Sequence, residues 1–519
     1  MAEGMRALSG WRRWLCALGL GLVAALAQAP FGILPALFAF AGLFLLVEGS
    51  VRHGRPLRSA FVATFLFGFG ANLLGLYWIG FAFLVQADQF AWMIPVLVPG
   101  LMAFLALYAG LAGVLAVFAW RGPWGRSGIG RVLAFAGVWA LCEFLRGHLF
   151  TGFPWNLVSQ SATAWLPLAQ NAAWAGPYGL SLVLVVLATL PALGLTRRWP
   201  WIALAGGLGA LWLYGAVGLL AAGTPPTPEA TLLVVQPNVP QRDKLDPDKQ
   251  AINLRRTLEM TAAAAADVEG PAYVVWPENT FPFLSEQPEV EAGLARRLPD
   301  EAVLITGTIR AEETEAGFDF FNAVEVYGPT GDEGKRLAAT YAKHHLVPFG
   351  EYLPLEGLFE ATGLAAMSPV GGGGFTAGPG PAVVEAGPAP FAPLICYEDV
   401  FPRQLYPEGD RPHWLVVVTN DAWFGDGAGP KQHLAIARMR AIESGLPVVR
   451  AANTGISAVI DAQGRLLEAL PLYEAGVIEA ALPPAKPRTI YDRLGGAVLS
   501  ILLALVAVAP WASGLARRG

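Results

Sequence analysis

The feature that most constrains the fold of this chain is a series of apolar runs long enough to cross a lipid bilayer. A membrane-spanning helix needs about 20 mostly apolar residues, and such runs recur through the first 223 residues and once more near the end of the 519-residue chain. Only 14% of the residues are charged and the mean hydropathy is +0.47, whereas a soluble protein carries about 25% charged residues. We predict an integral membrane protein with eight spans, at residues 12–28, 32–50, 58–84, 91–119, 130–148, 176–195, 199–222 and 494–512.

The placement of arginines predicts the orientation of these spans. Lys and Arg concentrate in the cytoplasmic loops of membrane proteins. If the eight spans alternate in direction, every arginine cluster that flanks them lies on one side, which we expect to be the cytoplasm. Both termini are then cytoplasmic, and the polar segment that follows residue 223 faces the opposite side. The clusters are Arg6, Arg12 and Arg13; Arg52, Arg55 and Arg58; Arg121, Arg126 and Arg131; Arg197 and Arg198; and Arg517 and Arg518.

The distribution of charge divides the chain into three parts. We expect a seven-span bundle at residues 1–223, a polar domain at 224–493 and a C-terminal membrane helix at 494–519. Residues 149–175 join spans five and six, and their aromatic side chains are typical of an arm that lies at the level of the lipid headgroups. Trp155 in this arm, with Tyr77 and Trp78 near the end of span three, either anchors the protein in the bilayer or forms part of a site that admits lipid.

The polar domain alternates between strands and helices. Apolar strands that end in polar residues are predicted within 231–241, 272–280 and 414–426, and further strands at 302–310, 320–328 and 391–396. Helices are predicted at 246–267, 287–298 and 431–445, and paired strands at 446–452 and 455–461. This order is typical of an α/β domain whose sheets are covered by helices.

A cysteine, Cys396, ends one of these apolar strands. The acidic residues that follow it lead into a predicted helix, and a strand-to-helix turn exposes a nucleophile above a sheet, near backbone N–H groups. It is the only cysteine outside the apolar runs, because Cys16 and Cys142 lie within them. Cys396 is therefore either a catalytic nucleophile or a buried, inert thiol.

Two further charged residues follow apolar segments of the same domain, Glu278 and Lys343. A carboxylate in a partly dry site can accept the proton of a thiol, and an ammonium can stabilise both the thiolate and the oxyanion of a tetrahedral intermediate. Each residue also has an ordinary interpretation. Glu278 could cap a helix or form a surface ion pair, and Lys343 could be solvated.

Four separated motifs resemble the Glu–Lys–Cys carbon–nitrogen hydrolase, or nitrilase, superfamily. They are WPEN at 276–279, YAKHHLVPFGEY at 341–352, CYED at 396–399 and NDAWFG at 420–425. With the multi-span N-terminal half and the single C-terminal span, the chain resembles the bacterial apolipoprotein N-acyltransferases. GFPWN at 152–156, QPNVPQ at 236–241 and ARMRAIESG at 437–445 also fit that family.

The resemblance implies a polytopic helical bundle of eight spans joined to a nitrilase-like αββα sandwich, in the inner membrane of a bacterium, with the sandwich and the 149–175 arm in the periplasm. It implies that Cys396 is the nucleophile, Glu278 the general base and Lys343 the stabiliser of the transition state. Leu245 stands where the family usually has Trp, and could still contact acyl chains. Further implied site residues are Glu351, Tyr397 and Glu398 in support of catalysis, and Asn420, Asp421, Trp423 and Phe424 along the pocket.

The implied reaction moves one fatty acyl chain between two lipids. The Cys396 thiolate attacks the sn-1 ester of a phospholipid, phosphatidylethanolamine by analogy, and the resulting thioester acylates the amine of the diacylglyceryl-cysteine of an apolipoprotein. This step ends the maturation of bacterial lipoproteins. We expect a monomer with no cofactor. The adjacent His344 and His345 lack the ligand pattern of a metal site, and a net charge of −5 argues against a nucleic acid partner.

Two other functions remain open from the sequence. The first is a membrane-anchored amidase or nitrilase that acts on a small soluble substrate, although a single span would suffice as an anchor. The second is a transporter or a lipoprotein-binding scaffold without catalytic activity. Charged residues within the spans are few, with Glu143 and Arg146 the notable ones, so no ion pathway is evident.

Overall fold

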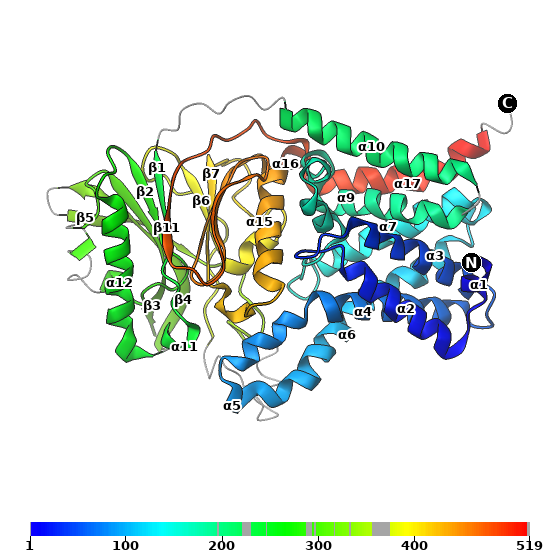
Figure 1. The fold of residues 1–519 in the computed structure, drawn as a ribbon, viewed down its shortest axis with the longest axis horizontal. Helices are drawn as coiled ribbons and strands as arrows, with labels where there is room; N and C mark the ends of the chain where they lie inside the picture. The colour runs from blue at the N-terminus through cyan, green and yellow to red at the C-terminus, as the bar shows by residue number, and fades with distance from the viewer. Residues whose placement is uncertain are drawn as a thin grey trace. The chain divides into compact units, whose positions relative to one another are not determined.

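The fold comes from a computed structural model, in which the chain forms two compact units (Figure 1). The helical unit comprises Met1–Gly223, Gly427–Ser444 and Arg488–Gly519, and the two-sheet unit comprises Thr224–Asp426 and Gly445–Pro487. The structure describes residues 2–194, 197–220, 230–244, 246–286, 293–294, 297–315, 317–331, 334–354 and 374–515.

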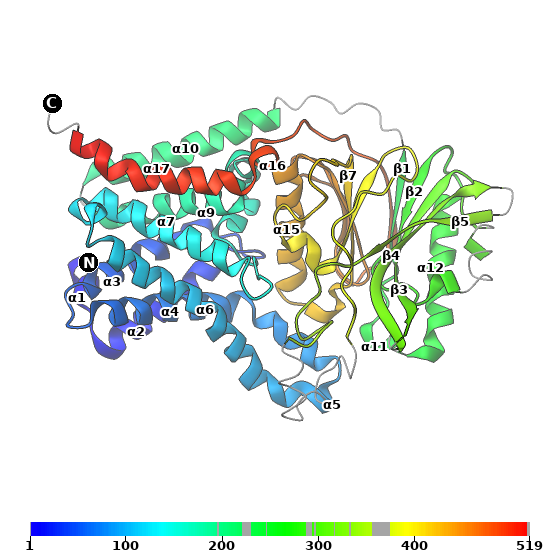
Figure 2. The same ribbon diagram turned by 180° about the vertical axis from the view of Figure 1, so that it is seen from behind.

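The helical unit is a bundle of apolar helices that run side by side (Figure 2). The C-terminal helix α17 returns to this bundle and packs against α7 and α9. The helices are α1 Ala2–Ala7, α2 Gly10–Ala25, α3 Ala39–Ser50, α4 Pro56–Gly75, α5 Ala87–Phe90, α6 Ile94–Ala119, α7 Gly128–Arg146, α8 Leu166–Ala169, α9 Ala172–Thr189, α10 Arg198–Leu220, α15 Gly429–Ser444, α16 Ile490–Leu494 and α17 Gly496–Leu515.

Every predicted span falls on a helix. By length and composition, five described helices could cross a membrane, at Pro56–Gly75, Ala87–Ala119, Gly128–Arg146, Ala172–Leu193 and Arg198–Leu220. Two shorter apolar helices, Leu34–Ser50 and Gly496–Pro510, match the second and eighth predicted spans, and α2 matches the first. The count of eight spans therefore stays a prediction. The third predicted span also ends earlier than expected, because the chain leaves α4 at Gly75 and continues as a 3-10 helix, η2 Tyr77–Leu84.

Ion pairs bring three of the arginine clusters to one end of the bundle. Both Arg6 and Arg131 lie 2.7 Å from the buried carboxylate of Glu48, and Arg6 and Arg52 both pair with Glu3. Residues that precede the first predicted span, follow the second and follow the fourth thus meet at the same end, which is what the alternating topology requires.

Glycines allow close helix packing in this unit. A Cβ atom at Gly21 of α2 would collide with the backbone carbonyl oxygen of Phe67 in α4. Helix association in lipid depends on such close contacts, because lipid tails are as apolar as the side chains they surround.

Helix α15 belongs to the helical unit although it lies within the polar part of the sequence. Its buried Gln432 accepts hydrogen bonds from the indole N–H groups of Trp155 (2.8 Å) and Trp78 (3.0 Å). It also donates to the carbonyl oxygens of Ala29 and Gly75, at 3.0 Å each. One side chain of α15 therefore joins four segments of the bundle. The domain boundaries at 223 and 493 stay a prediction, while the contacts group α15 with the membrane helices.

The two-sheet unit contains two mixed β-sheets. The first has the strand order β11-β1-β2-β3-β4-β5, and the second has the order β10-β9-β8-β7-β6. Strands β1, β2 and β3 are parallel, as are β6, β7 and β8. The strands are β1 Thr231–Gln236, β2 Ala272–Val275, β3 Ala302–Thr314, β4 Gly317–Gly331, β5 Gly334–Ala342, β6 Phe391–Ile395, β7 Trp414–Thr419, β8 Val448–Ala452, β9 Ser457–Ile460, β10 Leu466–Leu470 and β11 Gly476–Ala481.

One hydrophobic core lies between the two sheets. It joins Val234 and Ile305 of the first sheet to Ile395 and Val418 of the second, all of them fully buried. A second core lies on the other face of the first sheet, which α12 Pro247–Ala265 covers. Each fully buried aliphatic side chain contributes about 1.5–3 kcal/mol. The two inner sheets of the predicted αββα sandwich are present, with α12 in one outer layer.

Candidate active site

Cys396 begins the tight turn that follows β6. All five residues of β6 are buried, and the chain turns into a 3-10 helix, η9 Cys396–Val400. The backbone of Cys396 adopts a φ of +49°, a left-handed conformation that costs a non-glycine residue about 1–3 kcal/mol. The strand-to-helix turn predicted from the sequence is therefore present, in the strained form that lifts a nucleophile above a sheet.

Glu278 lies three residues beyond the end of β2, and its side chain is buried. Its Cα packs against Gly307 of the neighbouring strand β3, where a Cβ atom would lie only 2.5 Å from it. The carboxylate accepts a hydrogen bond of 2.7 Å from the Nδ2 group of Asn322. Burial raises the pKa of Glu278 and the charge of Glu351 adds to the rise, while Lys343 opposes it. A raised pKa is what a general base for a thiol needs.

Lys343 directly follows β5 and is 1% exposed. Its Nζ atom lies 2.8 Å from Oε1 of Glu351 and 4.0 Å from Oε1 of Glu278. Burial disfavours the charged ammonium, but the two carboxylates outweigh burial and raise the pKa of Lys343. The lysine therefore stays protonated between the two acids, and its solvated interpretation is wrong.

Asn322, in the middle of β4, joins these groups and was not predicted from the sequence. Its Nδ2 group donates to Glu278 at 2.7 Å and to Glu351 at 2.8 Å, and its backbone carbonyl oxygen accepts from the backbone N–H of Lys343 at 2.8 Å. The only sequence signal is an amide within a strand that is otherwise largely apolar, and that signal does not say which strands are neighbours.

The thiol of Cys396 lies within the electrostatic influence of the same groups. Burial raises its pKa, the negative charge of Glu278 raises it further, and Lys343 opposes the rise. The resting thiol is therefore neutral and needs a base to ionise it. The structure thus brings Glu278, Lys343 and Cys396 together, and burial excludes the surface ion pair considered for Glu278.

Glu398 connects the turn at Cys396 to the loop after Lys343. Its fully buried carboxylate accepts hydrogen bonds from the backbone N–H of Ile395 (2.8 Å), the backbone N–H of His344 (2.8 Å) and the hydroxyl of Tyr341 (2.8 Å). Burial opposes ionisation, but the hydrogen bonds and the neighbouring His344 ring outweigh it and lower the pKa of Glu398. Glu398 is therefore an ionised anchor between two segments of the site.

Tyr397, the residue after the nucleophile, makes aromatic contacts. Its ring lies 5.8 Å from that of His345 and 5.0 Å from that of Phe401 in edge-to-face contacts, and His345 stacks on Phe401 at 3.7 Å. These three aromatic rings form a cluster directly after the nucleophile.

A buried arginine, Arg450 of β8, lies behind the turn. Its guanidinium is 2.5 Å from Asp421 and 3.6 Å from Asp399, and all three side chains are fully buried. Asp421 also accepts a hydrogen bond from Thr419 at 3.1 Å. Arg450 therefore ties the end of β7 to the turn at Cys396. Arg450 was not predicted from the sequence, although a lone arginine in an apolar strand was a usable signal.

Asn420 takes part in a network of amides. It donates to Gln241 at 2.6 Å and accepts from Asn453 at 3.1 Å, and it is 3% exposed. In this structure Asn420 thus holds the turn after β1. By contrast, Trp423 in the next turn is 38% exposed, and Phe424 is half-buried.

The other predicted substrate contacts lie in the helical unit or outside the described residues. Trp155 and Trp78 are buried around Gln432, with ring centroids 5.0 Å apart, while Tyr77 is 43% exposed. Much of the 149–175 arm is likewise buried, so only part of it could lie at the headgroup level, as Phe150 (77% exposed) and Trp165 (49% exposed) could. Leu245 is not among the described residues.

No group of three His, Cys, Asp or Glu side chains is placed to hold a metal ion within the part of the chain that the structure describes. The carboxylates of Glu278 and Glu351 already pair with Lys343 and Asn322. The chemistry that this arrangement can perform is proton transfer from a thiol to a carboxylate beside a fixed cation.

Comparisons with known proteins cover both units. The apolipoprotein N-acyltransferase N-terminal domain family matches residues 20–190, and the carbon–nitrogen hydrolase family matches residues 234–490. An apolipoprotein N-acyltransferase of Rhodopseudomonas palustris is 40% identical, over 98% of this chain and 96% of its own length. The chain belongs to the apolipoprotein N-acyltransferase family.

Other members of the apolipoprotein N-acyltransferase family align similarly. That of Allorhizobium ampelinum is 39% identical over 94% of this chain and 93% of its own length. That of Bradyrhizobium diazoefficiens is 39% identical over 96% of this chain and 94% of its own length. Among solved structures, a mutant of a Nesterenkonia AN1 amidase of the nitrilase superfamily is 21% identical, with a TM-score of 0.35, over 54% of this chain and 99% of its own. The family models and the full-length relatives confirm the resemblance drawn from the four motifs.

Proposed function

We propose that this protein transfers a fatty acyl chain from a phospholipid to the N-terminal diacylglyceryl-cysteine of apolipoproteins, through a thioester on Cys396. The observation that carries the proposal is the position of a buried thiol within the influence of a base, Glu278, and a fixed cation, Lys343. The names of the full-length relatives support the acceptor, and the apolar helices support a substrate that resides in the membrane.

In the first half-reaction, Glu278 accepts the proton of Cys396 and the thiolate attacks the sn-1 ester carbonyl, by family analogy that of phosphatidylethanolamine. The C–S bond forms as the carbonyl becomes an oxyanion. Lys343 stabilises this charge, together with the backbone N–H of Tyr397. The C–O bond then breaks, the protonated Glu278 returns the proton to the leaving oxygen, and a lysophospholipid departs.

In the second half-reaction, the amine of the apolipoprotein attacks the thioester. Glu278 accepts a proton from the attacking nitrogen, the C–S bond breaks, and the thiolate of Cys396 recovers the proton. The product is an amide, and the lipoprotein then carries three acyl chains. Because the site is dry, it protects the thioester from water, which separates a transferase from its hydrolase relatives.

The positions of the other groups suit supporting roles. Glu351 holds Lys343 in place (2.8 Å), and Glu398 fixes the loop of the lysine against the turn of the nucleophile. Exposed Trp423 and half-buried Phe424 would contact the acyl chains, with Asn420 and Asp421 behind them. Contacts of Tyr77, Trp78, Trp155 and Leu245 with lipid stay predictions.

We place the protein in the bacterial inner membrane as a monomer, with the two-sheet unit in the periplasm and both termini in the cytoplasm. The common position of Arg6, Arg52 and Arg131 at one end of the bundle supports this orientation. Spans that hold the site at the membrane surface raise the effective concentration of both lipid substrates.

The test supplies the purified protein with a phospholipid labelled in its sn-1 chain and with a diacylated lipopeptide. We expect label on the lipopeptide amine, and none with Cys396→Ala. Full activity of both Cys396→Ala and Cys396→Ser would rule out the nucleophile. The match to carbon–nitrogen hydrolases over residues 234–490 also allows an amidase of small substrates. Release of ammonia from small amides, with no transfer of label, would favour that function.

A further inference from the structure

We propose that Lys244 is a positioning residue for Glu278: it holds the backbone of the base and supplies a positive charge that favours the ionised form of its carboxylate. This inference rests on the proposed function, because it assumes that Glu278 is the base. Lys244 lies outside the four motifs that carry the predicted catalytic residues. It ends α11 Gln241–Lys244, a single helical turn between β1 and α12.

The first observation is a direct contact. The ammonium of Lys244 donates a hydrogen bond of 2.8 Å to the backbone carbonyl oxygen of Glu278. On the other side, the backbone of Glu278 packs against Gly307, where no side chain would fit. The base is therefore held between the strand β3 and the lysine.

The second observation is the attachment of α11 at its other end. Gln241 accepts a hydrogen bond of 2.6 Å from Asn420, which follows β7. This turn of helix thus connects the ends of three strands. It follows β1, its Gln241 accepts from Asn420 after β7, and its Lys244 donates to Glu278 after β2. Movement of α11 would move the backbone of Glu278.

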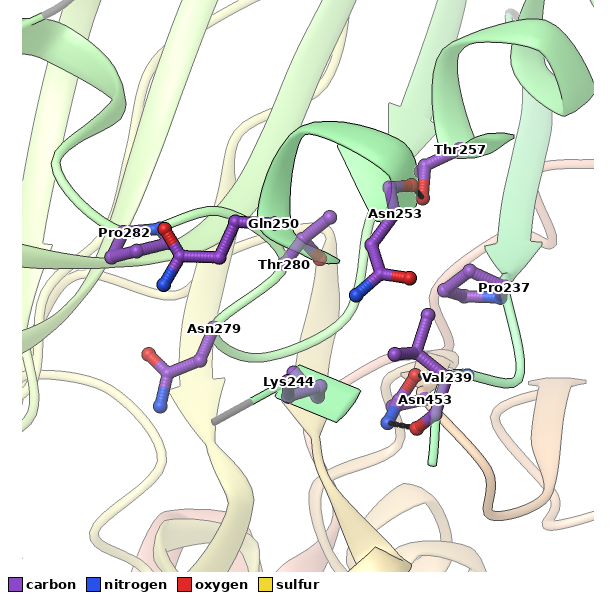
Figure 3. A pocket seen from close by; sticks show the side chains of 10 residues that line it. All are labelled: Pro237, Val239, Lys244, Gln250, Asn253, Thr257, Asn279, Thr280, Pro282 and Asn453. Atoms are coloured by element: carbon purple, nitrogen blue, oxygen red, sulfur yellow. Dashed lines mark hydrogen bonds between the residues drawn. The ribbon is translucent and has the colours of Figure 1, made fainter. Parts of the chain in front are cut away.

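The third observation is the setting of the lysine in a small polar pocket (Figure 3). Lys244 lines a cavity of about 20 Å³ together with Asn253, Asn279 and Asn453. The residue after the base, Asn279, has a φ of +49°, and its buried Oδ1 atom has no hydrogen-bond partner. A neutral donor could satisfy the carbonyl of Glu278 without the cost of partly desolvating an ammonium, so the charge itself needs a reason.

The reason is the charge balance of the site. In the state in which Glu278 can accept a proton, its carboxylate and that of Glu351 face the single ammonium of Lys343, so these three groups alone do not balance in charge. Lys244 supplies the missing positive charge, and it lowers the pKa of Glu278. Burial lowers its own pKa to about 8, against the opposing effect of Glu278, so it is charged at neutral pH.

The other charged groups nearby have partners of their own. Glu398 accepts hydrogen bonds from backbone N–H groups and pairs with His344, while Asp399 and Asp421 share Arg450. On α12, Lys249 pairs with Asp243 at 2.8 Å. Both Lys343 and Lys244 lower the pKa of Glu278, and Lys244 is the one whose ammonium also contacts its backbone.

The experiment measures kcat/KM for cleavage of a labelled phospholipid against pH, for the full-length protein in lipid nanodiscs. The acid limb of this profile reports the ionisation of the base. In Lys244→Met the limb should move to higher pH by up to about 1 unit, because the carboxylate of Glu278 loses the effect of a positive charge. Lys244→Arg should keep the limb near its original position, and so should the matched control Lys249→Met.

Lys244→Gln keeps a donor for the carbonyl without the charge, so it should shift the limb as Lys244→Met does while folding more readily. A lower rate at every pH with an unmoved limb, in both neutral variants, would overturn the inference and leave Lys244 a structural residue. If instead Glu278→Gln retained full activity, the proposed function itself would fail, and the two failures are thereby distinguished.

Discussion

Lys343 lies closer to Glu351 than to Glu278, at 2.8 Å against 4.0 Å. The lysine is thus tied to the acid that follows it by eight residues and remains only loosely associated with the predicted base. This asymmetry leaves Glu278 able to accept a proton, because a tight ion pair with Lys343 would stabilise its charged form and weaken it as a base. Asn322 donates a hydrogen bond to each of the two carboxylates and so links Glu278 to Glu351.

Glu351→Gln should therefore inactivate the protein without unfolding it. Without the Glu351 charge, Lys343 would move toward Glu278 and pair with it, which lowers the basicity of Glu278. We expect acylation of Cys396 at pH 7 to fall at least about 100-fold, the lower range for a general base. The matched control is Glu259→Gln on the exposed face of α12, which should behave as the unmodified protein. Acylation within threefold of normal in Glu351→Gln would contradict this account.

Asn322→Asp should shift the pH dependence of the first half-reaction. A third carboxylate beside Glu278 and Glu351 adds a negative charge, so the pKa of Glu278 should rise further. Because Glu278 must be ionised to accept a proton, the acid limb of kcat/KM should move to higher pH by about 1 unit or more. A profile that falls at all pH values without moving would show that the amide only supports packing.

Glu398→Gln should destabilise the two-sheet unit. The neighbours of this side chain donate hydrogen bonds, so the amide of glutamine would place one N–H group against other donors. Losing a charged acceptor costs about 1.5–3 kcal/mol for each hydrogen bond affected. The melting temperature should fall, whereas Glu408→Gln, in a surface ion pair with Arg403 at 3.2 Å, should leave it unchanged.

The same residue predicts a pH dependence of stability. The folded-state pKa of Glu398 is depressed, so its stabilising contribution is present above the unfolded pKa of about 4.3 and is lost as the pH falls through the lower folded value. The difference in melting temperature between the unmodified protein and Glu398→Gln should therefore shrink below about pH 4. A difference that stays constant down to pH 3 would show that the charge contributes nothing.

Gln432→Leu should loosen the helical unit. It leaves the indole N–H groups of Trp78 and Trp155 and two backbone carbonyls without the partner they now share, and each unsatisfied buried group costs about 1–3 kcal/mol. We expect a lower melting temperature in detergent and faster proteolysis of the 149–175 arm. Lys431→Met, at the exposed neighbouring position of α15, is the control. Equal melting temperatures of the two variants would refute the role of Gln432.

Much of the fold could be predicted from the sequence because buried segments are continuous apolar runs. The parallel strands β1, β2, β6 and β7 are fully or almost fully buried, so each reads as an apolar run bounded by polar turns. The edge strands β10 and β11 were not predicted, since they are largely exposed or half-buried and lack a continuous apolar run. Helix α15 was assigned to the polar domain because its charged residues, such as Arg440 and Glu443, pair with each other in the interior.

Only those site residues that lie in recognisable sequence motifs could be predicted. Cys396, Glu278 and Lys343 stand at ends of segments, where a functional group has a reason to be. Asn322, Arg450 and Lys244 contact partners that are distant in the sequence. Lys244 and Glu278, for example, are 34 residues apart. Such contacts depend on which strands become neighbours, and the pattern of a single segment does not contain that information.

The most direct test of the central claim is the intact mass of the protein during its two half-reactions. After incubation with phospholipid alone, we expect a mass increase of one acyl chain, located on Cys396 by peptide mapping and absent from Cys396→Ala. Addition of a diacylated lipopeptide should remove this adduct and yield the triacylated peptide. An adduct that decays to free fatty acid at the same rate with and without the lipopeptide, or acyl transfer with no adduct on Cys396, would contradict the claim.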